Sequence, residues 1–231
     1  MLVVSVVIVL LTAWLGWRRL IAACERENRA DWGSKWLNRL DGLNRIFCRK
    51  YHRLHFDPIP LPKSGGILVA SNHTSGLDPL LLIAASERPL RFLMALEYYE
   101  MWGLKWLFRA VGCIPVERSG RPQAALYSAR VALETGEAVA IFPHGAIHLD
   151  HELPRKLKRG VAWLACSIGA TIYPMRIEGV KGLDQVVRSV WRRSHARITC
   201  YPEIDVTDKS EQSILTELGQ HVAPGKLIPL E

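Results

Sequence analysis

Apolar side chains run without a charged residue from Met1 to Trp17, and Arg18 and Arg19 follow directly. A helix over this stretch would be about 25 Å long, close to the roughly 30 Å hydrocarbon core of a bilayer. The basic residues follow the apolar run, which is the reverse of the order in a secretory signal peptide. We therefore predict a membrane anchor over residues 1–20, with the rest of the chain on the cytoplasmic face.

A second apolar pattern, with positions mostly three and four residues apart, occupies residues 34–54 and predicts an amphipathic helix. Its other faces carry Lys35, Arg39, Arg45, Arg49, Lys50 and Arg53. Two interpretations stay open: the helix lies on an anionic lipid surface, or it packs on the domain like an ordinary helix. We assign residues 21–60 to this basic segment and to the proline-containing linker after it.

From residue 61 onward, short apolar runs alternate with helical patterns. Strands are predicted over residues 67–70, 91–95, 113–116, 138–142, 171–177 and 196–201. Helices are predicted from about residue 79, up to about residue 110, and over residues 122–135 and 157–168. Because such alternation is typical of α/β proteins, we expect residues 61–231 to form one α/β domain. Its central sheet should be mixed, largely buried and flanked by helices.

Composition and charge narrow the classes of partner. Of 231 residues, 49% are hydrophobic, which excludes a disordered chain and allows a sizeable core. The net charge of +8 favours an anionic partner. A basic cluster surrounds Trp191 and comprises Arg188, Arg192, Arg193, His195 and Arg197. It is interpreted either as a solvated face or as a patch that binds lipid headgroups or the phosphates of coenzyme A or acyl carrier protein. No nucleic-acid-binding motif accompanies it, so we expect no nucleic-acid partner.

The candidate chemistry follows the first predicted strand of the domain, within Ser71–Pro79. His73 lies in the turn and Asp78 opens the next helix, at the end of a strand where α/β proteins commonly hold their active residues. A folded-back turn would bring the carboxylate to one imidazole nitrogen and leave the other free to take a proton. Asp before Pro is also a common helix N-cap, and the two roles are compatible. We predict a catalytic His–Asp dyad.

The motif Asn72-His73-x4-Asp78 resembles the His-x4-Asp signature of the glycerolipid acyltransferases, the group that contains 1-acylglycerol-3-phosphate acyltransferase. Further segments resemble that family's other blocks in the same order: Gly112–Arg118, Phe142–Gly145, Leu157–Gly160 and Tyr173–Met175. The resemblance implies a membrane-bound O-acyltransferase. It would move a fatty acyl group from acyl-CoA or acyl-ACP to the hydroxyl of a lysolipid, with 1-acylglycerol 3-phosphate as the first expected acceptor.

The same resemblance implies roles for individual residues. His73 would act as general base and Asp78 would orient it, while Arg118 and Lys158 would bind the acceptor phosphate. Backbone N–H groups of the third block would stabilise the oxyanion. Because a thioester is already activated, we expect no permanently bound cofactor and no metal ion. A less favoured metal site would draw on the residues His144, His148, Asp150 and His151.

One departure from the family pattern affects the acceptor. His144, beside Gly145 in the predicted substrate-binding block, stands where the family usually has Glu, and Ala146 where it has Thr. The identity of the acceptor headgroup therefore stays open, and an amino-acid-linked lysolipid is an alternative acceptor.

Two other functions are a catalytically silent lipid-binding protein and a hydrolase using Ser71 or Ser75, although no Gly-x-Ser-x-Gly motif occurs. The expected partners are the lysolipid, the acyl donor and anionic membrane lipids.

Overall fold

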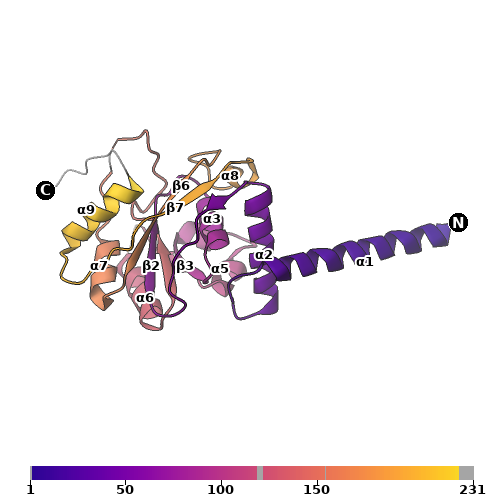
Figure 1. Ribbon diagram of the computed structural model, residues 1–231, viewed down its shortest axis with the longest axis horizontal. Coiled ribbons are helices and arrows are strands. Elements are labelled where there is room, and N and C mark those ends of the chain that lie inside the picture. The colour runs from indigo at the N-terminus through magenta and orange to yellow at the C-terminus, as the bar shows by residue number, and fades with distance from the viewer. Residues whose placement is uncertain (1, 119–121, 154, 224–231) are drawn as a thin grey trace.

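A sheet of seven strands is the centre of the computed structural model, which describes residues 2–118, 122–153 and 155–223 (Figure 1). The strands are β1 His55–Phe56, β2 Ile67–Ser71, β3 Leu90–Ala95, β4 Ile114–Val116, β5 Ala138–Ile141, β6 Ile172–Glu178 and β7 Arg197–Cys200. Their order is β1-β7-β6-β2-β5-β3-β4, and every pairing is parallel except β6 with β7. The sheet is therefore mixed, as predicted.

Helices cover both faces of this sheet because successive strand residues point to opposite sides. Leu68 of β2 packs in one core cluster with helices α6 Pro122–Glu134, α7 Gly160–Ile168 and α9 Glu211–Val222. Its neighbour Val69 packs in a second cluster with α3 Asp78–Ala85 and with Cys48 of α2 Lys35–Lys50. All five residues of β2 are buried, so the central strand is covered on both faces.

The apolar runs predict the six longer strands to within one residue at each end. The helix expected up to residue 110 is instead two short helices, α4 Leu96–Tyr99 and α5 Lys105–Ala110. Between them Gly103 adopts a φ of 81°, which a helix does not contain. Helix α7 begins at Gly160 rather than Leu157, because the Lys158 N–H binds the Pro143 carbonyl instead of extending the helix. Strand β1, α8 Arg188–Trp191 and α9 were not predicted.

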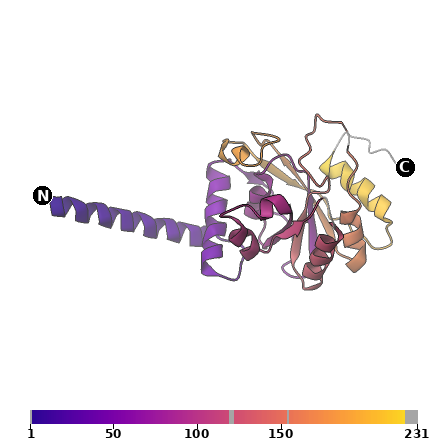
Figure 2. The same cartoon turned by 180° about the vertical axis from the view of Figure 1, so that it is seen from behind.

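The apolar N-terminus forms helix α1, Leu2–Glu27, which projects from the domain (Figures 1 and 2). It continues past Arg18 and Arg19, so the helix is longer than the predicted anchor of residues 1–20. Residues Val3–Glu27 suit a membrane span by length and composition, and the apolar window within them is wholly unburied. The other end of α1 packs on α2, where a Cβ at Gly42 would overlap the Cys24 carbonyl.

Helix α2 shows which of its faces contacts the domain. Ser34 caps its N-terminus, and the buried face carries the Asp41–Arg45 ion pair at 2.6 Å. Arg45 also donates to the carbonyls of Ala84 and Ser86 at the end of α3. The helix therefore packs on the domain, as one interpretation held. Much of the predicted apolar stripe is nevertheless exposed: Trp36, Leu40 and Leu43.

Candidate active site

The predicted site residues gather at one edge of the sheet. Strands β2, β3, β4, β5 and β6 run in the same direction, so their carboxyl ends share an edge. The loop with His73 and Asp78 follows β2, the block with His144 and Gly145 follows β5, and Arg118 follows β4. The fold therefore collects segments that lie far apart in the sequence around the end of a central strand.

The Asp78 carboxylate is fully buried and fixed by the loop that precedes it. Its Oδ2 lies 2.9 Å from the His73 Nδ1 and accepts hydrogen bonds from the backbone N–H groups of Thr74 (2.6 Å) and Ser75 (2.8 Å). The Ser75 hydroxyl donates to Oδ1 at 3.0 Å. Asp78 is not the N-cap of α3, a position held by Leu77. Its side chain instead turns back toward the loop, where it orients the imidazole.

The His73 ring is positioned from two further sides. It stacks on Phe142 with ring centroids 4.0 Å apart, and the His148 N–H binds the His73 carbonyl at 2.8 Å. A carboxylate can only accept, so Nδ1 is the donor in the contact with Asp78, and Nε2 is the ring nitrogen left for a substrate. The side chain is 18% exposed. This arrangement can accept a proton at Nε2 without moving the ring.

The residue before His73 holds the loop to the neighbouring strand. Asn72 is buried; its Nδ2 donates to the Ile177 carbonyl at 2.8 Å, and its Oδ1 accepts from the Ile177 N–H at 2.7 Å. These two hydrogen bonds extend the β2–β6 pairing by one residue, with the Asn72 side chain in place of a strand backbone. Asn72 therefore determines where the chain turns toward His73.

The structure brings Gly145 and Lys158, two of the predicted substrate-binding residues, next to each other. Gly145 adopts a φ of 70°, and its N–H donates to the Phe142 carbonyl, so this N–H serves the turn. A Cβ at Gly145 would lie 2.5 Å from Lys158 Cε and 2.7 Å from Nζ. A side chain at Gly145 would therefore require the end of the Lys158 side chain to move. In the structure the Lys158 ammonium lies against the loop that carries His144.

His144 itself is buried, with its ring 4.7 Å from that of His148. The His148 Nδ1 lies 2.7 Å from the Glu152 carboxylate, and hydrogen bonding, chiefly from the Leu149 N–H, lowers the pKa of Glu152. Asp150 pairs with the buried Arg176 at 2.6 Å. His148 and Asp150 are two of the four residues of the metal alternative. Both therefore already have protein partners.

Arg118 is exposed and paired with Glu97 of α4 at 3.2 Å. Strand β4 is the third strand from β2, so about 14 Å separates their ends. Among the described residues, the structure shows no contact between Arg118 and the dyad. An acceptor that reaches both would have to lie across the ends of β5 and β3.

The serines of the hydrolase alternative are engaged away from His73. Ser71 is fully buried and donates to Asn72 Oδ1 at 3.3 Å, while Ser75 donates to Asp78 and accepts from the Leu77 N–H. In the second block, burial raises the pKa of the Cys113 thiol to about 11, so this thiol is neutral at physiological pH. None of these groups has the contact with His73 that would activate a nucleophile.

Several supporting residues were not predicted from the sequence. The backbone donors of Thr74 and Ser75, the stacking partner Phe142 and the ion-pair partner Glu97 all depend on contacts between separate segments. Asn72 was the one with a local signal, since it directly precedes His73 in the motif. Its bonds to Ile177 show why an amide suits that position.

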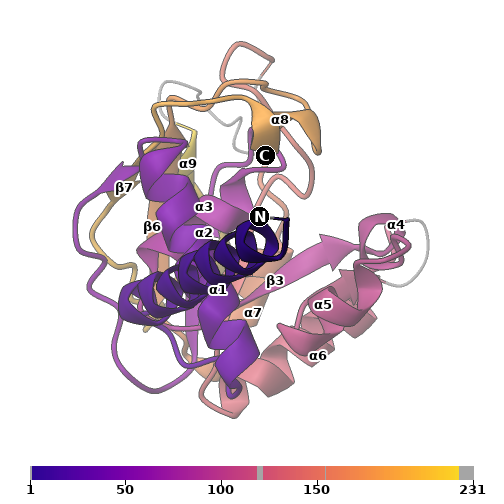
Figure 3. The same ribbon diagram turned by 90° about the vertical axis from the view of Figure 1, so that its right-hand side faces the viewer.

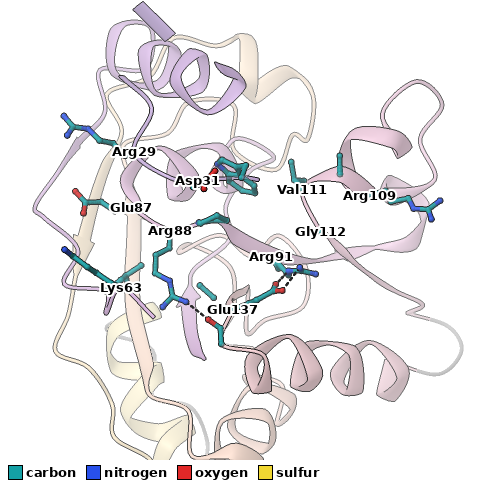
Figure 4. A pocket seen from close by; sticks show the side chains of 16 residues that line it. Arg29, Asp31, Lys63, Glu87, Arg88, Arg91, Arg109, Val111, Gly112 and Glu137 are labelled. Atoms are coloured by element: carbon teal, nitrogen blue, oxygen red, sulfur yellow. Dashed lines mark hydrogen bonds and ion pairs between the residues drawn. The ribbon is translucent and has the colours of Figure 1, made fainter. Parts of the chain in front are cut away.

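A cavity of about 790 Å³ lies at the opposite edge of the sheet, by the amino ends of β3 and β5 (Figure 4). Arg88 there donates to the carbonyls of Pro62, Gly65 and Gly136, and Arg91 pairs with Glu137. In Figure 4 the side chains of Arg29 and Arg109 extend to opposite sides. The cations nearest the strand ends are therefore already satisfied, and we assign this cavity no ligand.

Comparisons with known proteins identify the family of this chain. The family model Acyltransferase matches residues 53–178, more than half of the chain. A probable 1-acyl-sn-glycerol-3-phosphate acyltransferase of Mycoplasma pneumoniae is 30% identical over 133 residues, which are 54% of this chain and 49% of the relative. An uncharacterized protein of Mycobacterium leprae is 30% identical over 178 residues, 71% of this chain and 46% of the relative. The chain thus spans about half the length of these curated relatives.

Among solved structures, the fold is similar to that of the 1-acyl-sn-glycerophosphate acyltransferase PlsC from Thermotoga maritima. The TM-score is 0.65 with 18% sequence identity, and the match covers 84% of this chain and 81% of that one. This similarity supports the mixed α/β architecture. Together with the family match over the segments that carry His73, Arg118, Gly145 and Lys158, it confirms the resemblance found in the sequence. The chain belongs to the Acyltransferase family.

Proposed function

We propose that this protein is a membrane-associated lysophospholipid acyltransferase that transfers a fatty acyl group from a thioester to a lysophospholipid hydroxyl. The observation that carries the proposal is the 2.9 Å contact between His73 Nδ1 and the buried Asp78 carboxylate, at the strand edge where the family blocks meet. We propose 1-acylglycerol 3-phosphate as the acceptor, which the M. pneumoniae relative's name describes. The product would be phosphatidic acid.

The dyad supports direct transfer without an acyl-enzyme intermediate. The acceptor hydroxyl loses its proton to His73 Nε2 as its oxygen attacks the thioester carbonyl, and Asp78 stabilises the imidazolium that forms. The tetrahedral intermediate then collapses, the C–S bond breaks and the leaving sulfur takes the proton from His73. One ester and one thiol result. The step requires no nucleophile from the protein, consistent with the engagement of Ser71 and Ser75 elsewhere.

The acceptor phosphate would bind on the β5–β4 side of His73. Lys158 crosses the Gly145 turn there, and the Arg118 guanidinium is held near the end of β4 by Glu97. A lysine supplies a point charge, whereas an arginine offers a planar pair of donors. The buried His144 stands in the same loop and would shape the headgroup site in place of the family's usual glutamate. This is the part of the site where we expect acceptor preference to be determined.

The surface from which α1 projects suits a bilayer (Figure 3). Trp36 of α2 and Trp106 of α5 contact each other, with ring centroids 5.4 Å apart, and both are exposed. Trp102, between α4 and α5, is 96% exposed. Tryptophan favours the interface between lipid and water, where its ring is buried and its N–H stays hydrated. We therefore propose that α1 enters the membrane and that these tryptophans lie at its surface, on the cytoplasmic side.

The proposed function is tested with the purified chain in phosphatidylcholine vesicles that contain 1-acylglycerol 3-phosphate. Acyl-CoA and acyl-ACP are supplied separately as donors, and lysophosphatidylglycerol and an amino-acid-linked lysolipid serve as other acceptors. Products are identified by mass spectrometry. We expect phosphatidic acid and one equivalent of free thiol. Release of free fatty acid without ester would indicate a hydrolase, and absence of turnover with every acceptor would contradict the proposal.

A further inference from the structure

A hollow of about 540 Å³ lies between segments of the chain that join β6 to β7. Among the residues that the structure describes, the charged ones that line it are all cationic, namely Lys181, Arg192 and Arg193, and none is Asp or Glu. The remaining lining residues are Val180, Gly182, Leu183 and Gln185. The volume is in the range of small-molecule sites, and the charge favours an anionic ligand.

The cationic segments are held together by a buried hydroxyl. Ser194 is fully buried; its Oγ accepts from the Lys181 N–H at 2.9 Å and donates to the Arg192 carbonyl at 3.0 Å. Gly182 has a φ of 78°, and a Cβ there would lie 3.1 Å from Arg192 Cδ, so the arginine chain crosses the glycine. These contacts fix the backbone from which the cations extend. The hollow is therefore a built feature of the fold.

The same segment packs directly on the loop of the dyad. The Asp184 N–H donates to the Thr74 carbonyl at 3.0 Å, and the Gly76 N–H donates to the Gln185 carbonyl at 3.1 Å. A side chain at Gly76 would overlap the Val186 carbonyl, so the two loops are in close contact. Strand β6 is also the parallel neighbour of β2. The hollow thus adjoins the proposed site on the β6 side.

Two cationic groups therefore flank His73 from opposite sides. Arg118 and Lys158 lie toward β5 and β4, whereas the hollow lies toward β6 and β7. Figure 3 shows these separate sides. Helix α4 lies at the right, and α8, which directly precedes Arg192, lies at the top. An acceptor hydroxyl and a donor carbonyl must meet at His73, so two substrates that both carry phosphate need separate anion sites.

We propose that Lys181, Arg192 and Arg193 bind the phosphate groups of a nucleotide-linked acyl thioester, the class of donor to which acyl-CoA belongs. This inference rests on the proposed function, because it assigns the donor to the same site. The hollow takes the nucleotide phosphates while the thioester arm reaches across the Thr74–Gly76 loop to His73. The phosphate of the acceptor is left to Arg118 and Lys158.

The first test measures binding without turnover. The full chain with His73→Ala is titrated with coenzyme A in calorimetry, with and without Arg192→Gln and Arg193→Gln. We expect these two changes together to weaken binding by about tenfold or more, because each removes a charge-assisted contact. Arg188→Gln is the matched control, since it lies on the adjacent helix α8 but does not line the hollow. A failure of the acyl-transfer chemistry leaves this measurement intact.

The second test separates the sources of phosphate in the active enzyme. Arg192→Gln with Arg193→Gln should raise the KM for acyl-CoA about tenfold and leave the KM for acyl-pantetheine, which lacks the nucleotide, unchanged. Lys181→Gln should act in the same direction from the other segment. Equal effects on both donors, a raised KM for the lysophospholipid, a loss of vesicle binding, or an effect with acyl-ACP alone would each overturn the proposal. Unchanged coenzyme A binding would also overturn it.

Discussion

At the scale of single residues, Asp78 serves both the loop and the imidazole. Its Oδ2 accepts from the Thr74 and Ser75 N–H groups while it faces His73, so the loop and the ring share one carboxylate. The carboxylate is buried, yet these donors surround it and compensate for its lost hydration. The residue that orients the proposed base is therefore also a structural residue. Variants at Asp78 must be measured for both stability and activity.

Asp78→Asn is expected to lower turnover far more than stability. The amide oxygen still accepts from the backbone donors, and the Ser75 hydroxyl can rotate to accept from the new N–H group, so we expect a loss of about 1–3 kcal/mol. Turnover should fall by about a thousandfold, because His73 loses its negative partner and its tautomer is no longer fixed. Denaturant unfolding and steady-state kinetics measure the two effects. Global unfolding at room temperature would instead assign Asp78 a purely structural role.

Arg118→Ala tests the acceptor side of the site. Since the guanidinium is exposed and held by Glu97, its removal should raise the KM for 1-acylglycerol 3-phosphate about tenfold with little change in stability. The KM for a lysolipid without a phosphate monoester should change much less. Arg130→Ala on α6 is the control, because Arg130 is also exposed and paired, with Glu134. Equal effects of the two variants would remove Arg118 from the proposed binding site.

At the scale of elements, the strands were the most predictable part of the fold. A short apolar run bounded by Gly or Pro is a sufficient signal for a buried parallel strand, as in β2 and β5. Strand β1 has two residues and forms through its partner β7, so it carries no local signal. Helix α9 does carry a local signal, the N-cap Ser210 followed by apolar residues at helical spacing.

The candidate site was predictable in its residue types but less so in its contacts. The sequence brings His73 and Asp78 within one loop, so their pairing follows from local geometry. The supporting contacts of Asn72 with Ile177 and of His73 with Phe142 join segments more than sixty residues apart and require the folded sheet. The apolar stripe of α2 also did not identify the buried face of the helix. That face carries the Asp41–Arg45 ion pair, whereas Trp36, Leu40 and Leu43 of the stripe are exposed.

Two glycines allow a matched comparison: Gly145 lies in the turn between β5 and α7, and Gly169 is the C-cap of α7. Gly145 and Gly169 both have positive φ, 70° and 66°, so Ala at either position should cost roughly 1 kcal/mol from the backbone. Only at Gly145 would the new Cβ displace Lys158, whereas Gly169 has open space around it. Gly145→Ala should therefore lower activity toward phosphate-bearing acceptors severalfold, and Gly169→Ala should not. Similar losses in both variants would show that Lys158 does not depend on this turn.

At the scale of the whole molecule, a projecting apolar helix (Figure 3) is joined to a domain that exposes Trp36, Trp102 and Trp106. Such a surface would be unfavourable in water and is typical of membrane contact. The net charge of +8 adds attraction to anionic lipids. In this arrangement the enzyme would meet its lipid acceptor at the bilayer surface and its donor from the aqueous side.

Removal of residues 1–17 should release the protein from membranes at least in part. The remainder of α1 keeps its packing on α2, so we expect the domain to stay folded while vesicle co-sedimentation falls. Residual binding should decrease with salt, because screening weakens basic contacts to anionic lipids. Unchanged sedimentation of the truncated chain would transfer the anchoring role to α2 and the exposed tryptophans.

The central claim is that the Asp78-oriented His73 removes the proton from the acceptor hydroxyl. The most direct measurement compares ester formation by the wild-type chain and His73→Gln in the same vesicles, with the same thioester and 1-acylglycerol 3-phosphate; the exposed His151→Gln is the control. We expect a loss of about a thousandfold for His73→Gln alone, with folding and vesicle binding unchanged. Activity of His73→Gln within a few fold of wild type would contradict the account.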